Sequence, residues 1–308
     1  MVTKAAAETG AGRQLPRDDE IFLDHVGHFV RDAQSASQGL ARAGFAPTPV
    51  SVQVNPDCTL TGTGNVTAML RGGYIEALFK TADTPLGREF DLAVARHSGL
   101  HLAAFSIADA AAWHRRLTDA GFAMRPLVNF QRPVETVDGP DVAAFTVVRL
   151  ERGAMAEGRI QMLTHRTEAT VWQPRWLSHP NGAVALVDLV VVCADVGEAA
   201  GRFARFAGRD SIATRFGQAI VLDRGQVQLV TREAFAELLP EIAIPGLPFM
   251  GAYAVRVQSL TAAETLLRKA GMTTRRSGAS LVVPFPSELG TGTWLFVEND
   301  ADLPWRSQ

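Results

Sequence analysis

A sequence repeat constrains the fold of this chain more than any other feature. The segment LDHVGHFVRDAQSASQGLARAGF at 23–45 aligns with LHLAAFSIADAAAWHRRLTDAGF at 100–122. Asp32 then matches Asp109, and Gly44 matches Gly121, both at an offset of 77 residues. Each copy reads as a β-branched-rich strand, an Asp that caps a helix, an amphipathic helix and a Gly that ends it. The chain therefore contains a duplicated strand–helix unit.

Two weaker copies follow, ALVDLVVVCADVGEAAGRFARFAGR and AYAVRVQSLTAAETLLRKAGM, so four units share one plan. A later strand closes each unit: GGYIEALF, EGRIQMLTH, RGQVQLVT and GTWLFVEN. A strand–helix–strand–strand–strand unit cannot bury its sheet face alone, so two units must pair. The sequence predicts an α+β fold of four βαβββ modules, paired into two tandem domains that are each a curled eight-stranded cup.

The repeat also predicts the domain boundaries. These are a disordered tail at 1–19, an N-terminal domain at 20–166 with modules 20–80 and 98–166, a linker at 167–182, and a degenerate C-terminal domain at 183–300 with modules 183–232 and 248–300. Trp172 and Trp176 suggest that the linker packs against a domain.

Composition limits the functional classes. Hydrophobic residues make up 47%, charged residues 20%, and the net charge is −2 without basic blocks. Nucleic acid and membrane partners are therefore not expected, and a small neutral or mildly anionic substrate suits the chain better. Cys58 and Cys193 are isolated, which is typical of reduced thiols in the cytoplasm.

Common catalytic motifs are absent from the sequence. No GxSxG, HExxH, Walker loop or Rossmann fingerprint occurs in its proper context. Serine hydrolase, zincin, nucleotide-hydrolysing and NAD-dependent activities are therefore not expected.

Three stretches of the first module carry a family resemblance: Leu23-Asp24-His25-Val26, Gly62-Thr63-Gly64-Asn65 and Gly73-Tyr74-Ile75-Glu76. With the module plan, they resemble the vicinal-oxygen-chelate superfamily, which has the fold of glyoxalases, bleomycin-resistance proteins and extradiol dioxygenases. The first module is similar to the glyoxalase-like branch. The resemblance implies a divalent metal on the cup floor, held by side chains from the first and last strands of the modules.

In this sequence the implied metal ligands are His25 and Glu76, with Gln161 as a weak third donor. An imidazole and a carboxylate suit Zn, Fe(II), Mn, Co or Ni. The other modules depart from the pattern. The corresponding first-strand and last-strand positions are Leu102 and Gln161, Asp188 and Gln228, and Ala252 and Leu295. If a metal binds, the N-terminal cup holds it.

Further site residues follow from position. Glu76 and His165 are the candidates for moving a proton, and His165 is also a reserve ligand because it lies four residues after Gln161 in a strand. Asn65, Leu102, Phe130 and Arg132 are the candidates for substrate contacts. Gly62 to Asn65 is expected as a turn in the cup wall. His101 should point away from the cup, and His28 is expected to be structural.

The leading functional hypothesis is an enzyme in which one divalent metal ion chelates adjacent oxygens of a small substrate, with lyase- or isomerase-type chemistry. The first alternative is a metal-free binding protein, similar to the drug-sequestering members of the superfamily. The second is an extradiol-type dioxygenase, which needs two histidines and one carboxylate on one face of the metal. A homodimer is compatible with a repeat of this kind.

Overall fold

A computed structural model describes residues 13–55 and 57–306 of the protein. The first module comprises β1 (Ile21–Phe29), α1 (Ala33–Arg42), β2 (Ser51–Val54), β3 (Leu60–Met69) and β4 (Tyr74–Lys80). Helix α2 (Pro85–Arg96) leads to the second module, which comprises β5 (Gly99–Ile107), α3 (Ala110–Asp119), β6 (Val128–Thr136), β7 (Gly139–Arg149) and β8 (Arg159–His165). The connection to the second half contains α4 (Glu168–Val171) and the 3₁₀ turn η2 (Pro174–Trp176).

The third module comprises β9 (Ala183–Val192), α5 (Val196–Ala207), β10 (Ser211–Thr214), β11 (Gly217–Val221) and β12 (Gln226–Val230). After α6 (Arg232–Leu238), the fourth comprises β13 (Phe249–Val257), α7 (Leu260–Lys269), β14 (Arg275–Ser277), β15 (Ser280–Pro284) and β16 (Thr293–Val297). The 3₁₀ turns η3 (Ser287–Leu289) and η4 (Asp300–Asp302) flank the last strand. No helix within the described residues is long and apolar enough to cross a membrane.

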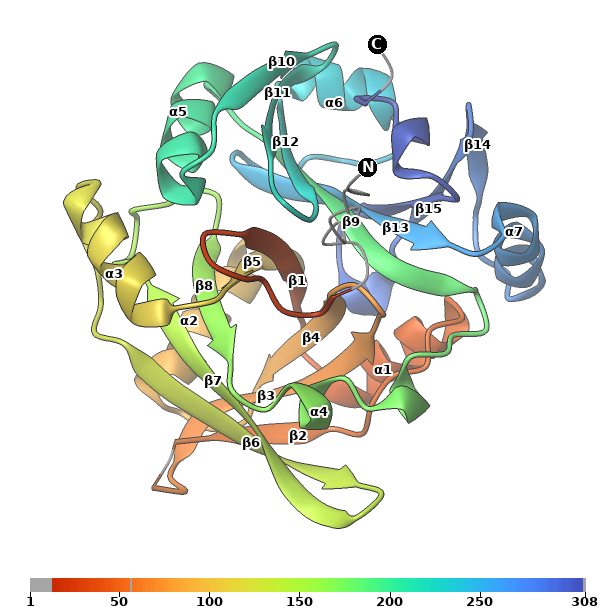
Figure 1. Ribbon diagram of the computed structural model, residues 1–308. Helices are drawn as coiled ribbons and strands as arrows, with labels where there is room; N and C mark the ends of the chain where they lie inside the picture. The colour runs from red at the N-terminus through yellow and green to blue at the C-terminus, as the bar shows by residue number, and fades with distance from the viewer. Residues whose placement is uncertain (1–12, 56, 307–308) are drawn as a thin grey trace, which may run out of the picture.

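The modules pair into two eight-stranded sheets, as predicted (Figure 1). The first sheet has the order β1-β4-β3-β2-β6-β7-β8-β5 and closes into a barrel, whereas the second is open, with the order β10-β11-β12-β9-β13-β16-β15-β14. Closure of the barrel depends on a single register pair between β2 and β6, Val54 with Gln131. The first sheet is therefore a cup whose open side has been sealed, and its interior is called the N-terminal cup below.

Strand register shows which positions of the modules correspond. Glu76 pairs with Gly27 in the first module, and Gln161 pairs with Ala104 in the second. The first-strand partners, Gly27 and Ala104, keep the offset of 77 residues. The third and fourth modules give the same relation, Gln228 with Val190 and Leu295 with Ala254. The positions compared from sequence are thus structurally equivalent.

The predicted helix starts are present in all four modules. The side chains of Asp32, Asp109, Asp195 and Ser259 accept hydrogen bonds from backbone N–H groups in the first turn of the helix that follows. These bonds satisfy amide groups that a helix cannot satisfy internally. Gly208 ends α5 with φ +62°, the left-handed conformation for which glycine is suited.

The stretch from Gly62 to Asn65 was expected as a turn, but it lies within strand β3. Gly64 is required there for lack of space, because a Cβ atom would approach the Phe79 ring to 2.7 Å and the carbonyl oxygen of Ser51 to 2.9 Å. The glycine thus permits close packing of a strand, and it does not mark a reversal of the chain.

Two apolar clusters include residues of the N-terminal cup and of the segments that pack on it. At one end Phe90 of α2 stacks on Phe29 of β1, with ring centroids 4.0 Å apart. At the other end Trp172, which follows α4, packs edge-on against Tyr74. The linker therefore packs against the first sheet.

The concave face of the second sheet is filled by the chain itself. Asp188, at the position of His25, accepts hydrogen bonds from Trp305 Nε1 at 2.7 Å and Arg306 Nε at 3.0 Å. Leu303 and Trp305 join the apolar cluster that includes Ala252 and Leu295. In the second sheet, the segment from Leu303 to Arg306 therefore occupies the space that corresponds to the cavity of the N-terminal cup.

The two sheets share one extended core, to which strands and helices of all four modules contribute. Of the predicted disordered tail, residues 1–12 lie outside the described residues. Residues 13–19 contact the body of the protein: the carbonyl oxygen of Arg13 accepts a hydrogen bond from Arg224 Nη1 at 2.7 Å, and Leu15 packs against the Trp172 cluster.

Candidate functional site

The N-terminal cup contains a cavity of about 80 Å³. Its walls come from β1, β2, β3, β4, β5, β6, β7, β8 and the start of α2. The lining residues are His25, Gln53, Asn65, Tyr74, Glu76, Leu78, Leu86, Leu102, Phe130, Gln131, Arg132, Phe145, Val147, Arg149, Arg159, Gln161 and Leu163. The first module thus contributes mostly polar groups, whereas the second contributes all the arginines and most of the apolar groups.

The cavity gathers seven of the eight residues proposed from sequence. They are His25, Asn65, Glu76, Leu102, Phe130, Arg132 and Gln161. The eighth, His165, is buried but does not line the cavity. Residues separated by up to 136 positions in the chain therefore meet because the barrel brings their strands around one axis.

A buried carboxylate fixes the orientation of His25. The pairing of β1 with β5 is irregular between Leu23 and His25, which leaves Asp24 without a strand partner. Asp24 is fully buried, and its Oδ1 lies 2.7 Å from His25 Nδ1. Burial acts to raise the pKa of Asp24, but the charges and hydrogen bonds of His165 and His25 outweigh it and hold the pKa well below its usual range. An ionised Asp24 can only accept, so Nδ1 donates and Nε2 faces the cavity.

His165 contacts the other oxygen of the same carboxylate. Its Nε2 lies 2.9 Å from Asp24 Oδ2, and its ring packs on Trp172 with centroids 4.5 Å apart. Its Nδ1 is buried and has no hydrogen-bond partner within the described chain. His165 therefore lies behind Asp24, and the carboxylate separates it from the cavity.

Glu76 faces His25 across the cup. Its Oε1 accepts a hydrogen bond from Asn65 Nδ2 at 2.5 Å, and its Oε2 lies 3.5 Å from His25 Nε2. Both side chains are nearly buried, at 5% exposure for Glu76 and 4% for His25. With Nδ1 of His25 donating to Asp24, a neutral ring presents a lone pair at Nε2 to a carboxylate oxygen. Two acceptors at this separation require a proton or a cation between them.

The donor set fits a divalent metal ion with open positions. Two ligands that are each ~2.1 Å from one ion at a tetrahedral angle are roughly 3.4 Å apart, close to the observed separation. The Asp24 contact with the far nitrogen of His25 is the outer-shell partner that metal-bound histidines usually have. Within the described residues, no group of three or more His, Cys, Asp or Glu side chains is arranged to hold a metal. Gln161 is the remaining neutral oxygen donor at an equivalent position.

Tyr74 adds a hydroxyl group to the cavity. Its ring stacks on His25, with centroids 4.3 Å apart and planes 21° apart. Burial, together with the negative charges of Asp24 and Glu76, raises the pKa of Tyr74 well above its usual value. The hydroxyl therefore remains protonated and is able to donate a hydrogen bond.

Cations outnumber anions on the cavity wall. Arg132, Arg149 and Arg159 line it, whereas Glu76 is the lone acidic residue among the described lining residues. Arg159 pairs with Glu89 at 3.1 Å. Arg149 lies over the ring of Phe130, and its Nε is buried without a hydrogen-bond partner. The cavity thus favours a ligand with negative charge.

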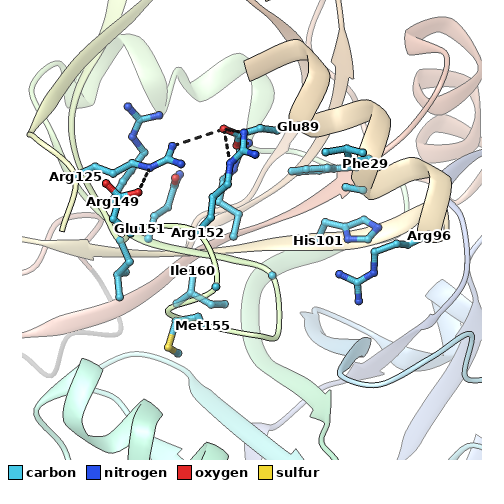
Figure 2. Close-up of a pocket in the computed structure, with 17 residues that line it drawn as sticks. Phe29, Glu89, Arg96, His101, Arg125, Arg149, Glu151, Arg152, Met155 and Ile160 are labelled. Carbon is cyan, nitrogen blue, oxygen red and sulfur yellow. Dashed lines mark hydrogen bonds and ion pairs between the residues drawn. The ribbon is translucent and has the colours of Figure 1, made fainter. Parts of the chain in front are cut away.

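A second cavity of about 280 Å³, the outer pocket, adjoins the cup (Figure 2). Arg149, Arg159 and Gln161 line both cavities. In Figure 2 Glu89 of α2 receives ion pairs from neighbouring arginines, among them Arg152 at 2.5 Å. Arg96, Arg125, Arg149, Arg152 and Arg159 face two glutamates, Glu89 and Glu151, across this pocket. The outer pocket is therefore a positively charged approach to the Gln161 side of the cup.

The remaining histidines lie outside the cup. His101 lines the outer pocket, as its alternation predicts, and its Nε2 lies 2.8 Å from the carbonyl oxygen of His97. His28 is buried between the sheets, where Nδ1 contacts the carbonyl oxygen of Leu289 at 2.9 Å. Only His25 among the described histidines lines the cavity.

Sequence reasoning missed Asp24, Tyr74, Arg149 and Arg159. The last three share a face with a predicted site residue or with a cavity residue, because Tyr74 is two residues from Glu76, Arg159 is two from Gln161, and Arg149 is two from Val147. Strand alternation therefore contained the signal. Asp24 could not be found in this way, since its place depends on the irregular pairing of β1.

Comparisons with known proteins agree with this fold. The model of the family described as "Glyoxalase-like domain" matches residues 23–207, which is more than half of the chain. No curated protein sequence matches the chain. A hypothetical protein from Staphylococcus aureus is similar in structure, with TM-score 0.60 and 10% identity, over 90% of this chain and 98% of the other.

Two further solved structures are similar at low identity. A triple mutant of 4-hydroxymandelate synthase from Streptomyces coelicolor has TM-score 0.58 and 15% identity, over 90% of this chain and 92% of the other. A xylose isomerase-like TIM barrel/4-hydroxyphenylpyruvate dioxygenase fusion protein has TM-score 0.52 and 12% identity, over 92% of this chain and 50% of the other. At these identities the likeness concerns the fold alone. The family match, together with the paired βαβββ modules, places the chain in the glyoxalase-like domain family of the vicinal-oxygen-chelate superfamily.

Proposed function

We propose that the protein is a glyoxalase-like enzyme with lyase- or isomerase-type chemistry on a small oxygen-chelating substrate, and that the N-terminal cup is its active site. His25 and Glu76 would hold one divalent metal ion, with Gln161 as a weak third donor. The supporting observation is the 3.5 Å separation of His25 Nε2 and Glu76 Oε2 inside a buried cavity. A bound divalent ion supplies Lewis acidity to adjacent substrate oxygens.

The side chains around this pair have separate tasks. Asp24 fixes the ring of His25, and His165 fixes Asp24, so His165 acts as a positioning residue. Asn65 holds Oε1 of Glu76, which leaves Oε2 facing His25 Nε2 across the implied ion site. Tyr74 remains protonated and can donate to a substrate oxygen. Leu102, Phe130 and other apolar side chains exclude water from the reacting groups.

Elemental analysis of the metal-loaded protein tests the proposal. After incubation with Zn, Mn, Co or Ni and removal of the excess, the wild-type chain should retain about one ion. Glu76→Gln keeps the shape of the side chain and removes its charge, so this variant should lose most of the ion, and turnover should fall with it.

Glu151→Gln is the matched control, because Glu151 is an exposed carboxylate of the outer pocket and does not line the cup. It should retain the ion as the wild type does. A wild-type chain that retains no divalent ion, or a Glu76→Gln variant that retains as much as the wild type, would contradict the metal-dependent mechanism.

A metal-free binding protein is the second candidate function. It is favoured by Leu102, which occupies the position equivalent to His25 and cannot bind a metal. Phe130, Phe145, Val147 and Leu163 give the same wall an apolar surface. Such a protein would bind its ligand equally well in the presence of a chelator and after Glu76→Gln substitution.

Two of the similar structures bear names of a synthase and a dioxygenase fusion, but the cup offers little support for ring-cleaving oxygenation. That chemistry needs two histidines and a carboxylate around iron. Within the described chain, His101 lines the outer pocket and His165 lies behind Asp24, so His25 is the one histidine that faces Glu76.

A further inference from the structure

We propose that the cup binds a substrate that carries an oxyanion group, a carboxylate or a phosphate, and that Arg132 of β6 is the residue that binds this group. The proposal rests on the proposed function in taking the N-terminal cup as the active site. It adds the chemical class of the substrate and its orientation in the cup.

The first observation is an unpaired cation. Arg132 is 8% exposed, and neither a hydrogen bond nor an ion pair to its guanidinium group occurs within the described chain. The guanidinium nitrogens are not among the fully buried atoms without a partner, so they stay open to the space that they line, although arginines with so little exposure are usually paired. Burial lowers the pKa of Arg132 and nearby Tyr74 and Glu76 oppose this, but the group stays charged. An anionic ligand would supply the missing partner.

The second observation is the direction of the side chain. Phe130, Gln131 and Arg132 of β6 all line the cavity, and Arg132 also borders a neighbouring pocket of about 240 Å³ beside β2 and the linker. Tyr74 and Glu76, which act on the charge of Arg132, are residues of the cup floor. The guanidinium group presents paired N–H donors that match the two oxygens of a carboxylate or phosphate. A substrate held there has its neighbouring atoms beside Glu76.

Arg149 is the other arginine that could bind the oxyanion group. The β6–β7 hairpin places it far from Arg132. Arg132 pairs with Ala143 in the register of β6 with β7, and Arg149 lies six residues further along β7. Six residues of a strand span about 20 Å, so the two arginines begin at distant points of the wall. Arg149 also lines the outer pocket. We assign Arg149 to attracting anions toward the cup and Arg132 to binding them inside it.

The test uses lactate, inorganic phosphate and lactamide as probes, with binding measured by calorimetry and by the shift in Tm. Lactamide is the neutral match of lactate. Wild-type protein should bind at least one of the two anions and should not bind lactamide. Arg132→Gln should weaken anion binding by roughly 10- to 100-fold, the loss typical of a charged hydrogen bond. Which anion binds more tightly distinguishes a carboxylate from a phosphate substrate.

Three further variants complete the design. Arg132→Lys preserves the charge and should retain part of the affinity, which also guards against misfolding of Arg132→Gln. Arg166→Gln removes an exposed arginine near the end of β8 and should bind as the wild type does. Arg149→Gln should bind within a few fold of the wild type.

The proposal is overturned if neither anion binds to the wild type, if folded Arg132→Gln binds as tightly as the wild type, or if Arg149→Gln abolishes binding while Arg132→Gln does not. Its failure is distinct from failure of the proposed function, because metal retention is measured without any anion. If the chain retains no metal but still binds an anion through Arg132, the result supports the anion site and contradicts the metal-dependent mechanism.

Discussion

At the scale of single residues, the cup depends on one buried carboxylate that contacts two histidines. Asp24 has no direct access to the cavity, yet it determines which nitrogen of His25 faces Glu76. A histidine without this contact would exchange tautomers and rotate more freely. The sequence neighbours Asp24 and His25 therefore act as one unit, although strand alternation would separate them.

We expect Asp24→Asn to weaken metal binding by 10- to 100-fold, the usual cost of losing an outer-shell partner of a histidine ligand. The amide preserves the shape of the side chain, but it no longer places a negative charge beside the rings of His25 and His165. Metal affinity is measured by competition with a chromophoric chelator, and circular dichroism checks the fold. Unchanged affinity in a folded Asp24→Asn variant would show that the contact has no part in the site.

At the scale of elements, glycine positions determine how closely strands approach around the cup. Gly64 lies in β3 against the Phe79 ring of β4. The motif Gly-Thr-Gly-Asn suggests a turn when read locally, because glycines usually mark one. The motif is extended because β3 pairs with β2 and β4. The four residues of the motif alone do not indicate this pairing.

Substitution Gly64→Val should lower the free energy of unfolding by about 1 to 3 kcal/mol, since a side chain there has to displace Phe79 or the backbone at Ser51. Urea unfolding followed by fluorescence measures the change. Gly121→Val would be a poor control because its φ is +83°. Gly201→Ala serves as the control without a clash, because a Cβ atom there meets nothing within 4 Å, and in the interior of α5 it should leave stability unchanged or raise it by up to about 1 kcal/mol. Equal stability of Gly64→Val and the wild type would contradict the packing argument.

At the scale of the whole molecule, a buried polar chain joins the two sheets. His28 of β1 contacts the hydroxyl of Tyr253 of β13 at 3.0 Å, and Trp294 Nε1 donates to the same oxygen at 2.5 Å. Burial is the main cause that lowers the pKa of His28 to about 4. His28 is therefore neutral in the folded protein at neutral pH, and its ring acts as a hydrogen-bonding spacer between the domains.

This pKa predicts how stability depends on pH. In the unfolded chain His28 takes up a proton below its ordinary pKa of ~6.5, whereas in the folded chain it resists protonation until about pH 4. Stability is then complete above pH ~6.5 and falls as the pH drops toward 4, by about 3 kcal/mol for this residue. His101, whose pKa is also lowered to about 4 by burial, adds to the trend.

Urea titrations at several pH values test this dependence. We expect His28→Gln to reduce the loss of stability between pH 6.5 and 4, whereas His114→Gln should follow the wild type. The same acid sensitivity in His28→Gln as in the wild type would rule out His28 as its source.

The module plan, the helix starts and the equivalent ligand positions could be predicted because they are periodic or local. The offset of 77 residues between modules matches His25 with Leu102, and the similar closing strands of the modules match Glu76 with Gln161. The closure of the barrel between β2 and β6, the C-terminal segment in the second cup and the Asp24 contacts could not be predicted. Each depends on one long-range contact that leaves no repeat in the sequence.

The most direct test of the central claim, that His25 and Glu76 act together on one ion, is a double-mutant cycle of metal affinity. The four proteins are the wild type, His25→Asn, Glu76→Gln and the double variant. We predict that each single substitution lowers affinity nearly as much as both together, with a coupling above ~1 kcal/mol. Additive effects, or a single variant that binds the ion as the wild type does, would contradict the claim.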